Sequence, residues 1–208
     1  MNSSKKSILN SNFTYLAAFV LPVIMMMALY YTRGIFPWGN ECYLRSDMYH
    51  QYAPFFSELW HKIRNGESLT YSWNIGMGTN FTSLFAYYLA SPSNWFVALF
   101  PQKYTIEIMN AFIILKIAGS SLSLTYYLTK HNNNKHVIAA IFGMFYGMSG
   151  FIAAYSWNIM WLDCVILIPL IMLGLERLVN ENRCIFYCIT LGSVSYTHLR
   201  AHETLANL

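Results

Sequence analysis

The residues best suited to chemistry lie in the stretch SDMYHQYAPFF, which follows the first long apolar run. Asp47, His50 and Gln51 are spaced so that, on a helix, they occupy the same face. A carboxylate and an imidazole are side chains that accept and donate protons. A carboxylate at the start of a helix also tends to be ionised, as a base must be. The helix dipole alone also favours an acidic residue in that first turn, so the position by itself does not assign a function.

Further along the chain, polar groups lie within or next to apolar runs. Lys116 is in the middle of FIILKI, where a charge inside a membrane is costly and marks a functional candidate. It would hold a lipid phosphate, pair with a carboxylate, or face a water-filled cavity. Asn158 and Asp163 belong to WNIMWLD at the start of another apolar run. Asp163 and His50 are one carboxylate and one imidazole, which is a weak case for a metal site. A divalent metal therefore stays open, and no other cofactor is implied.

Composition identifies the kind of protein that must position these residues. Of the 208 residues, 56% are hydrophobic, 17% are aromatic and only 11% are charged. Soluble domains carry about twice that share of charged residues, and Tyr and Trp favour membrane boundaries. We therefore predict an all-α, multi-pass membrane protein. The net charge is only +4, and the basic residues do not form a stripe along the sequence. Both observations argue against nucleic acid as a partner.

The apolar runs divide the chain into predicted segments. The expected divisions are a cytoplasmic N-terminus at 1–12, spans at 13–33, 105–129, 137–156, 160–176 and 184–192 (the last one truncated), a long loop at 34–104, and a tail at 193–208. Short basic segments at Lys5–Lys6, 130–136 and 177–183 then fall on one side of the membrane. The positive-inside rule predicts that this side is cytoplasmic and that the 34–104 loop lies outside the cell.

The long loop contains two predicted helices. Residues 47–64 place apolar and polar side chains on opposite arcs, with Ser46 as the N-cap and Gly66 at the end. Such a helix lies flat on a membrane surface with its apolar arc in the lipid. Residues 92–100 are predicted to form a second interfacial helix. The segment between them contains Gly-x-Gly without a third glycine, so a dinucleotide site is rejected.

The last residues break the pattern of the chain. An apolar run stops after about nine residues and becomes polar without a turn signal. The string VSYTHLRAHET resembles translated sequencing-adapter sequence that recurs at the ends of reading frames from metagenome assemblies. We expect residues from about Val194 onward to be non-native, and the chain to be the N-terminal piece of a longer protein.

The order and spacing of several motifs resemble a known family. The first apolar run, SDMYHQYAPFF, SWNIGMGTNF, YYLASPSNW and WNIMWLDCVILIPLIMLGLERL together resemble the N-terminal part of the bacterial YfhO membrane proteins over roughly residues 13–192. That family is similar to GT-C glycosyltransferases, which take sugars from polyprenyl-phosphate donors. The resemblance implies a multi-pass protein of the bacterial plasma membrane.

The resemblance also implies roles for the candidate residues. GT-C enzymes carry an essential acidic residue in the first outer loop, and Asp47 matches that position as the base that activates an acceptor hydroxyl. The implied partners are the polyprenyl-phosphate sugar, the bilayer, and a cell-envelope acceptor such as teichoic or lipoteichoic acid. His50, Gln51, Lys116, Asn158 and Asp163 are then candidates for substrate binding, and Lys116 or Arg45 for balancing phosphate charge.

Two other readings compete with a glycosyltransferase. A transporter or flippase for lipid-linked sugars would concentrate polar groups at the bilayer midplane, with broken helices. Lys116 and Pro169 are compatible with it. A non-catalytic assembly protein would tolerate Asp47→Asn. The polar groups gather in the outer loop and at helix ends, which favours the enzyme.

Overall fold

The computed structural model describes residues 2–133 and 137–195, with side chains from residue 12 onward. It confirms an all-α multi-pass membrane protein, with almost no sheet. Within these ranges, four helical stretches are long and apolar enough to cross a bilayer: Asn12–Thr32, Gln102–His131, Val137–Tyr155 and Ile159–Glu181. Most of the tail predicted to be non-native lies outside the described residues.

The spanning helices form a bundle around one central member. The helices are α1 (Asn2–Thr32), α4 (Thr105–His131), α5 (Val137–Gly147), α6 (Gly150–Tyr155), α7 (Ile159–Glu181) and α8 (Ile185–Val194). In its most apolar window α4 is 72% buried, against 28% for α1 and 22% for α5 with α6. Helix α4 is therefore the core of the bundle, whereas α1 and α5–α6 present most of their apolar surface outward.

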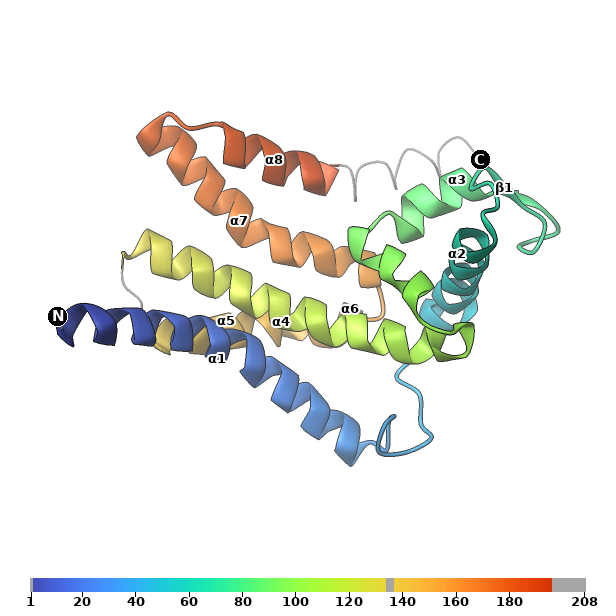
Figure 1. Cartoon of the computed structure of the whole chain (residues 1–208), viewed down its shortest axis with the longest axis horizontal. Helices are drawn as coiled ribbons and strands as arrows, with labels where there is room; N and C mark the ends of the chain where they lie inside the picture. Colours follow the sequence, from blue (N-terminus) through green and yellow to red (C-terminus); the bar gives the residue numbers. More distant parts are fainter. Residues whose placement is uncertain (1, 134–136, 196–208) are drawn as a thin grey trace.

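Two of the spans are not straight. Helix α1 contains Pro22, which removes a backbone hydrogen bond, and its second half bends away from α4 (Figure 1). The predicted third span is broken after Gly147, and a new short helix begins at Gly150. The second half of α1 and the short helix α6 both lie toward the end of the bundle away from the N-terminus (Figure 1).

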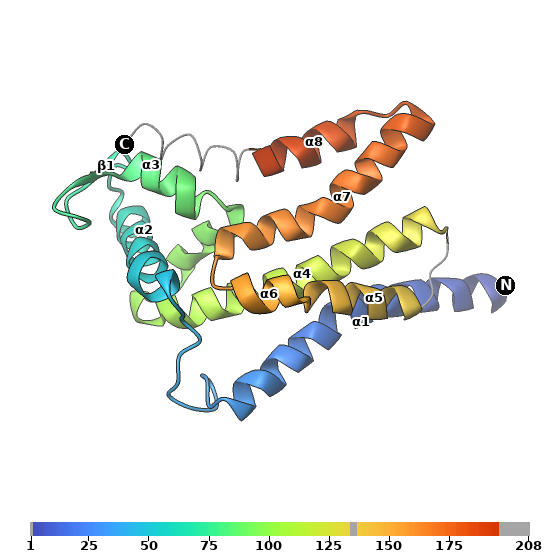
Figure 2. The same ribbon diagram turned by 180° about the vertical axis from the view of Figure 1, so that it is seen from behind.

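Residues 33–104 gather at that end of the bundle, called here the loop end, opposite the N-terminus (Figure 2). The elements there are a π-helical turn η1 (Met48–Tyr52), α2 (Ala53–Asn65), strands β1 (Tyr71–Ser72) and β2 (Thr79–Asn80), α3 (Phe81–Leu84), a π-helical turn η2 (Phe85–Leu89), and 3₁₀ helices η3 (Pro92–Leu99) and η4 (Gln102–Tyr104). Strands β1 and β2 pair antiparallel, with Tyr71 opposite Asn80. Helix α2 lies across the ends of the spanning helices.

Helix α2 differs from the predicted surface helix on both arcs. Its apolar residues Phe56 and Leu59 are fully buried in the protein core, where Phe56 packs near Phe112 of α4, instead of facing lipid. Its polar residues Glu58 and Lys62 are also buried, because the segment after the helix folds back over them. An amphipathic pattern shows that a helix has two faces, and it does not show what covers each face.

Candidate functional site

A strained turn presents the predicted catalytic residue. Ser46 has φ +47°, a left-handed conformation that costs a non-glycine residue about 1–3 kcal/mol. The Met48 amide donates to the Arg45 carbonyl at 2.9 Å and closes the turn. Asp47, and not Ser46 as predicted, is the N-cap of the following helical turn, and its side chain makes no capping bond. The turn places a cation and a carboxylate on either side of one strained residue.

Asp47 is half-buried, and its carboxylate has no hydrogen bond or ion pair within the described residues. His50 is exposed, with its ring edge-on to Tyr49. Gln51 is half-buried and accepts a 2.8 Å hydrogen bond from the Tyr88 hydroxyl. Asp47 and His50 are therefore available to a ligand, whereas the amide oxygen of Gln51 already has a partner.

Tyr52 connects this turn to the beginning of α7. Its buried hydroxyl donates to Oδ1 of Asn158, another predicted site residue. Burial raises the pKa of Tyr52, and the negative charge of Asp47 adds to the rise. Burial also raises the pKa of Tyr88, again with a contribution from Asp47. Both phenols therefore stay protonated near the carboxylate, and Asn158 fixes the position of the turn.

Lys116 and Asp163 form an ion pair between α4 and α7. Lys116 Nζ lies 2.9 Å from both carboxylate oxygens of Asp163. It also donates to Ser91 Oγ and to the Ile159 carbonyl, each at 3.2 Å. Of the options open to Lys116 from sequence, the structure shows pairing with a carboxylate. Asp163 keeps 16% side-chain exposure and lines a groove of about 570 Å³ between α7 and α8.

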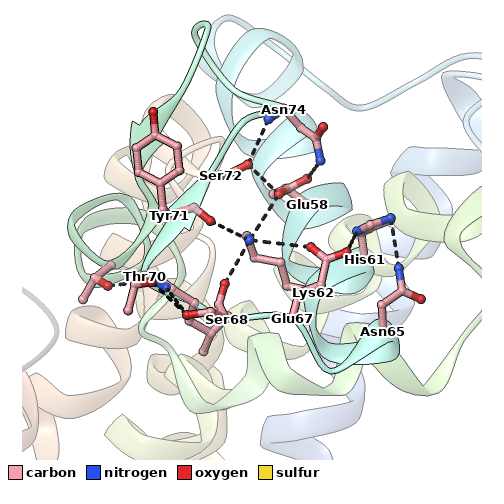
Figure 3. Close-up of polar contacts among 12 residues, drawn as sticks. Glu58, His61, Lys62, Asn65, Glu67, Ser68, Thr70, Tyr71, Ser72 and Asn74 are labelled. Carbon is pink, nitrogen blue, oxygen red and sulfur yellow. Dashed lines mark hydrogen bonds and ion pairs between the residues drawn. The ribbon is translucent and has the colours of Figure 1, made fainter.

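A second polar cluster, not singled out from sequence, lies under the β1–β2 hairpin (Figure 3). Lys62 Nζ donates to the carbonyls of Ser68 at 2.9 Å and Tyr71 at 2.8 Å, and lies 3.7 Å from Glu58 Oε1. Glu58 accepts from Ser72 Oγ at 2.6 Å and from Asn74 Nδ2 at 3.0 Å. The one sequence feature that could have indicated this cluster is the i,i+4 spacing of Glu58 and Lys62, but the same spacing is typical of solvated helix faces.

The charges of this hairpin cluster are satisfied by one another. Burial raises the pKa of Glu58, but hydrogen bonds from Ser72 and Asn74, together with the charge of Lys62, outweigh it, so the net pKa is lowered. The cluster fixes a hairpin whose tip carries exposed Trp73 and Met77. Its role is to hold the loop in place.

The described residues also limit the chemistry of the site. In residues 2–133 and 137–195, no three His, Cys, Asp or Glu side chains gather as a metal site would require. Cys42, Cys164, Cys184 and Cys188 form no disulfide within the described residues. The arrangement thus provides an unpaired carboxylate, an exposed imidazole and a nearby cation at the loop end of a membrane bundle.

Comparison with known proteins gives one match. Residues 17–194 match the family described as bacterial membrane protein YfhO. No curated protein and no solved structure matches the chain.

Proposed function

The chain belongs to the YfhO family of bacterial membrane proteins, and on that premise we propose that it is a membrane glycosyltransferase of GT-C type. The donor is a polyprenyl-phosphate sugar, and the acceptor is a cell-envelope polymer such as teichoic or lipoteichoic acid. The loop end faces the outside of the plasma membrane, as the basic segments Lys5–Lys6, 130–133 and 177–183 at the other ends of the helices favour.

The observation that carries this proposal is the unpaired carboxylate of Asp47. Asp163 and Glu58, by contrast, are held by lysines. A general base must be free to take a proton from its substrate, and such a group contributes about 10²–10⁴-fold to a rate. In the proposed orientation Asp47 lies on the outer loop, next to the membrane surface at which a lipid-linked donor would meet a water-borne acceptor.

The reaction is a displacement at the anomeric carbon of the donor sugar. Asp47 takes the proton of an acceptor hydroxyl, and the oxygen forms a bond to the anomeric carbon. The bond from that carbon to the phosphate oxygen breaks, and polyprenyl phosphate leaves with the electron pair. The configuration at the carbon inverts.

The other candidate residues receive supporting roles. His50 is exposed beside the base and contacts the acceptor. Gln51 and Asn158 orient the turn through Tyr88 and Tyr52. Lys116 and Asp163 neutralise each other and set the position of the α7 start. A flippase needs charged residues that change partners during transport. Because Lys116 and Asp163 are already paired with each other, they do not favour a flippase.

The test uses the whole protein, expressed in a bacterial host that lacks its own copy. Sugar incorporation into envelope polymers is compared for wild type and Asp47→Asn at matched membrane levels. We expect incorporation to fall at least 100-fold with normal insertion. Incorporation equal to that of the wild type would reject Asp47 as the base and favour an assembly role.

A further inference from the structure

A cleft of about 230 Å³ lies beside the strained turn, between α1 and the broken α5–α6 span. One wall is Met26 and Leu29 from the bent half of α1, and the other is Ile152 and Ala153 of α6. At its floor, Gly147 lies so close to α4 that an added Cβ would be 2.7 Å from the Ile117 carbonyl. The cleft lies between the second half of α1, which bends away from α4 (Figure 1), and the break between α5 and α6.

Arg45 brings a positive charge to this apolar cleft. The residues that line it include Arg45, Tyr43 and Ser156. The Arg45 guanidinium lies over the Tyr43 ring, 5.8 Å from its centroid, and the Tyr43 hydroxyl is 2.7 Å from Ser156 Oγ. Within the described residues Arg45 has no carboxylate partner, whereas Lys116, the other candidate for phosphate, is held by Asp163. The guanidinium is thus positioned and uncompensated.

Each wall of the cleft has one buried residue, Met26 or Ile152, and one exposed residue at its edge. Leu29 is 42% exposed, and Ala153 is exposed as well. The occupant therefore has an apolar part that enters from the bilayer and an anionic part that reaches Arg45. A volume of about 230 Å³ is enough for a phosphate group and the first part of an attached chain.

We propose that this cleft binds the phosphate end of a single-chain polyprenyl phosphate, with the Arg45 guanidinium on the phosphate. Guanidinium groups bind phosphate oxygens through paired N–H donors. The assignment rests on the proposed function, because it makes Arg45 the site of the donor and the leaving group. Asp47 follows two residues later, so one turn carries the phosphate-binding cation and the base.

The test measures binding and not transfer. Full-length protein in lipid nanodiscs is titrated with a long-chain polyprenyl phosphate, and binding is followed by native mass spectrometry. Arg45→Ala is expected to weaken binding at least tenfold, and Arg45→Lys by less. Arg33→Ala is the matched control, because Arg33 is exposed and does not line the cleft. The neutral polyprenol should bind wild type and Arg45→Ala equally.

A second pair of variants tests the cleft without changing any charge. Ala153→Trp fills the cleft and should block binding, whereas Ala154→Trp, at the exposed neighbouring position outside the cleft, should not. Unchanged affinity in both Arg45→Ala and Ala153→Trp would overturn the proposal. Equal competition by phosphatidylglycerol would also overturn it and indicate a general phospholipid site.

The binding result is separate from the proposed catalytic role. Asp47→Asn should bind polyprenyl phosphate with wild-type affinity while losing transfer. If Asp47→Asn keeps transfer, the proposed function fails, and the Arg45 measurement still decides whether the cleft takes the lipid phosphate.

Discussion

The loop end contains two polar regions that differ in whether their charged side chains are paired. In the hairpin cluster, Lys62 and Glu58 are almost fully buried and every charge has partners. In the turn that contains Arg45 and Asp47, the backbone is strained and neither charge is paired within the described residues. Buried and fully satisfied charges specify a structure, whereas uncompensated charges at a strained turn are available to a ligand. The difference separates residues that hold the loop from residues that we propose to act on a ligand.

The largest expected effect comes from breaking the hairpin cluster. Lys62→Met leaves Glu58 buried without its cation, and we expect a loss of about 3–5 kcal/mol in the free energy of unfolding. Denaturant unfolding in detergent, followed by tryptophan fluorescence, measures it. The double variant Glu58→Gln with Lys62→Met should recover most of the loss. A single variant as stable as the wild type would show that the cluster does not hold the loop.

A smaller loss is expected from the ion pair between α4 and α7. Lys116→Met leaves Asp163 without its cation, but the 16% exposure of that carboxylate reduces the penalty to about 2–3 kcal/mol. Thermal unfolding in detergent is the measurement, with Asp163→Asn added to Lys116→Met as the rescue. If Lys116→Met keeps full stability and loses only lipid binding, Lys116 binds a ligand, as we propose for Arg45, and does not hold α4 and α7 together.

The hairpin glycines provide a sharper test of how the tip is held. Gly78 has φ +112°, and an added Cβ would lie 2.1 Å from the Tyr71 hydroxyl, so Gly78→Ala should cost about 1–2 kcal/mol. Gly76 has φ +57° with no atom near its Cβ, so Gly76→Ala carries backbone strain alone and should cost less. Protection of hairpin amides from hydrogen exchange measures both. Equal losses would mean that the Tyr71 contact contributes nothing.

The smallest effect is a pH dependence of the hairpin cluster. Because the folded-state pKa of Glu58 is lowered from 4.5, its contribution to stability is present above pH 4.5. It is lost as the pH falls through the lower folded-state value. We expect the unfolding temperature to drop in that acidic range, and the Glu58→Gln variant to lack this part of the drop. A wild-type curve that matches the variant would contradict the assignment.

Sequence patterns predicted the class of the fold because long apolar runs allow few alternatives in a membrane. They placed Lys116 in the middle of one apolar run and Asp163 at the start of another, and did not establish that the two pair, since pairing depends on how α4 and α7 pack. Within the predicted 47–64 helix, Glu58 and Lys62 belong to the polar arc, and a helical wheel does not show that the following hairpin folds back over that arc. The left-handed backbone conformation of Ser46 could not be predicted, because serine is not a residue type that favours a positive φ.

The most direct test of the contrast compares two carboxylates in purified full-length protein. Asp47→Asn and Glu58→Gln are each assayed for the unfolding temperature and for sugar transfer per folded molecule. We expect Asp47→Asn to keep the wild-type unfolding temperature and to lose transfer at least 100-fold, while Glu58→Gln unfolds at a lower temperature and transfers normally. Transfer by Asp47→Asn at the wild-type rate would rule out Asp47 as the base.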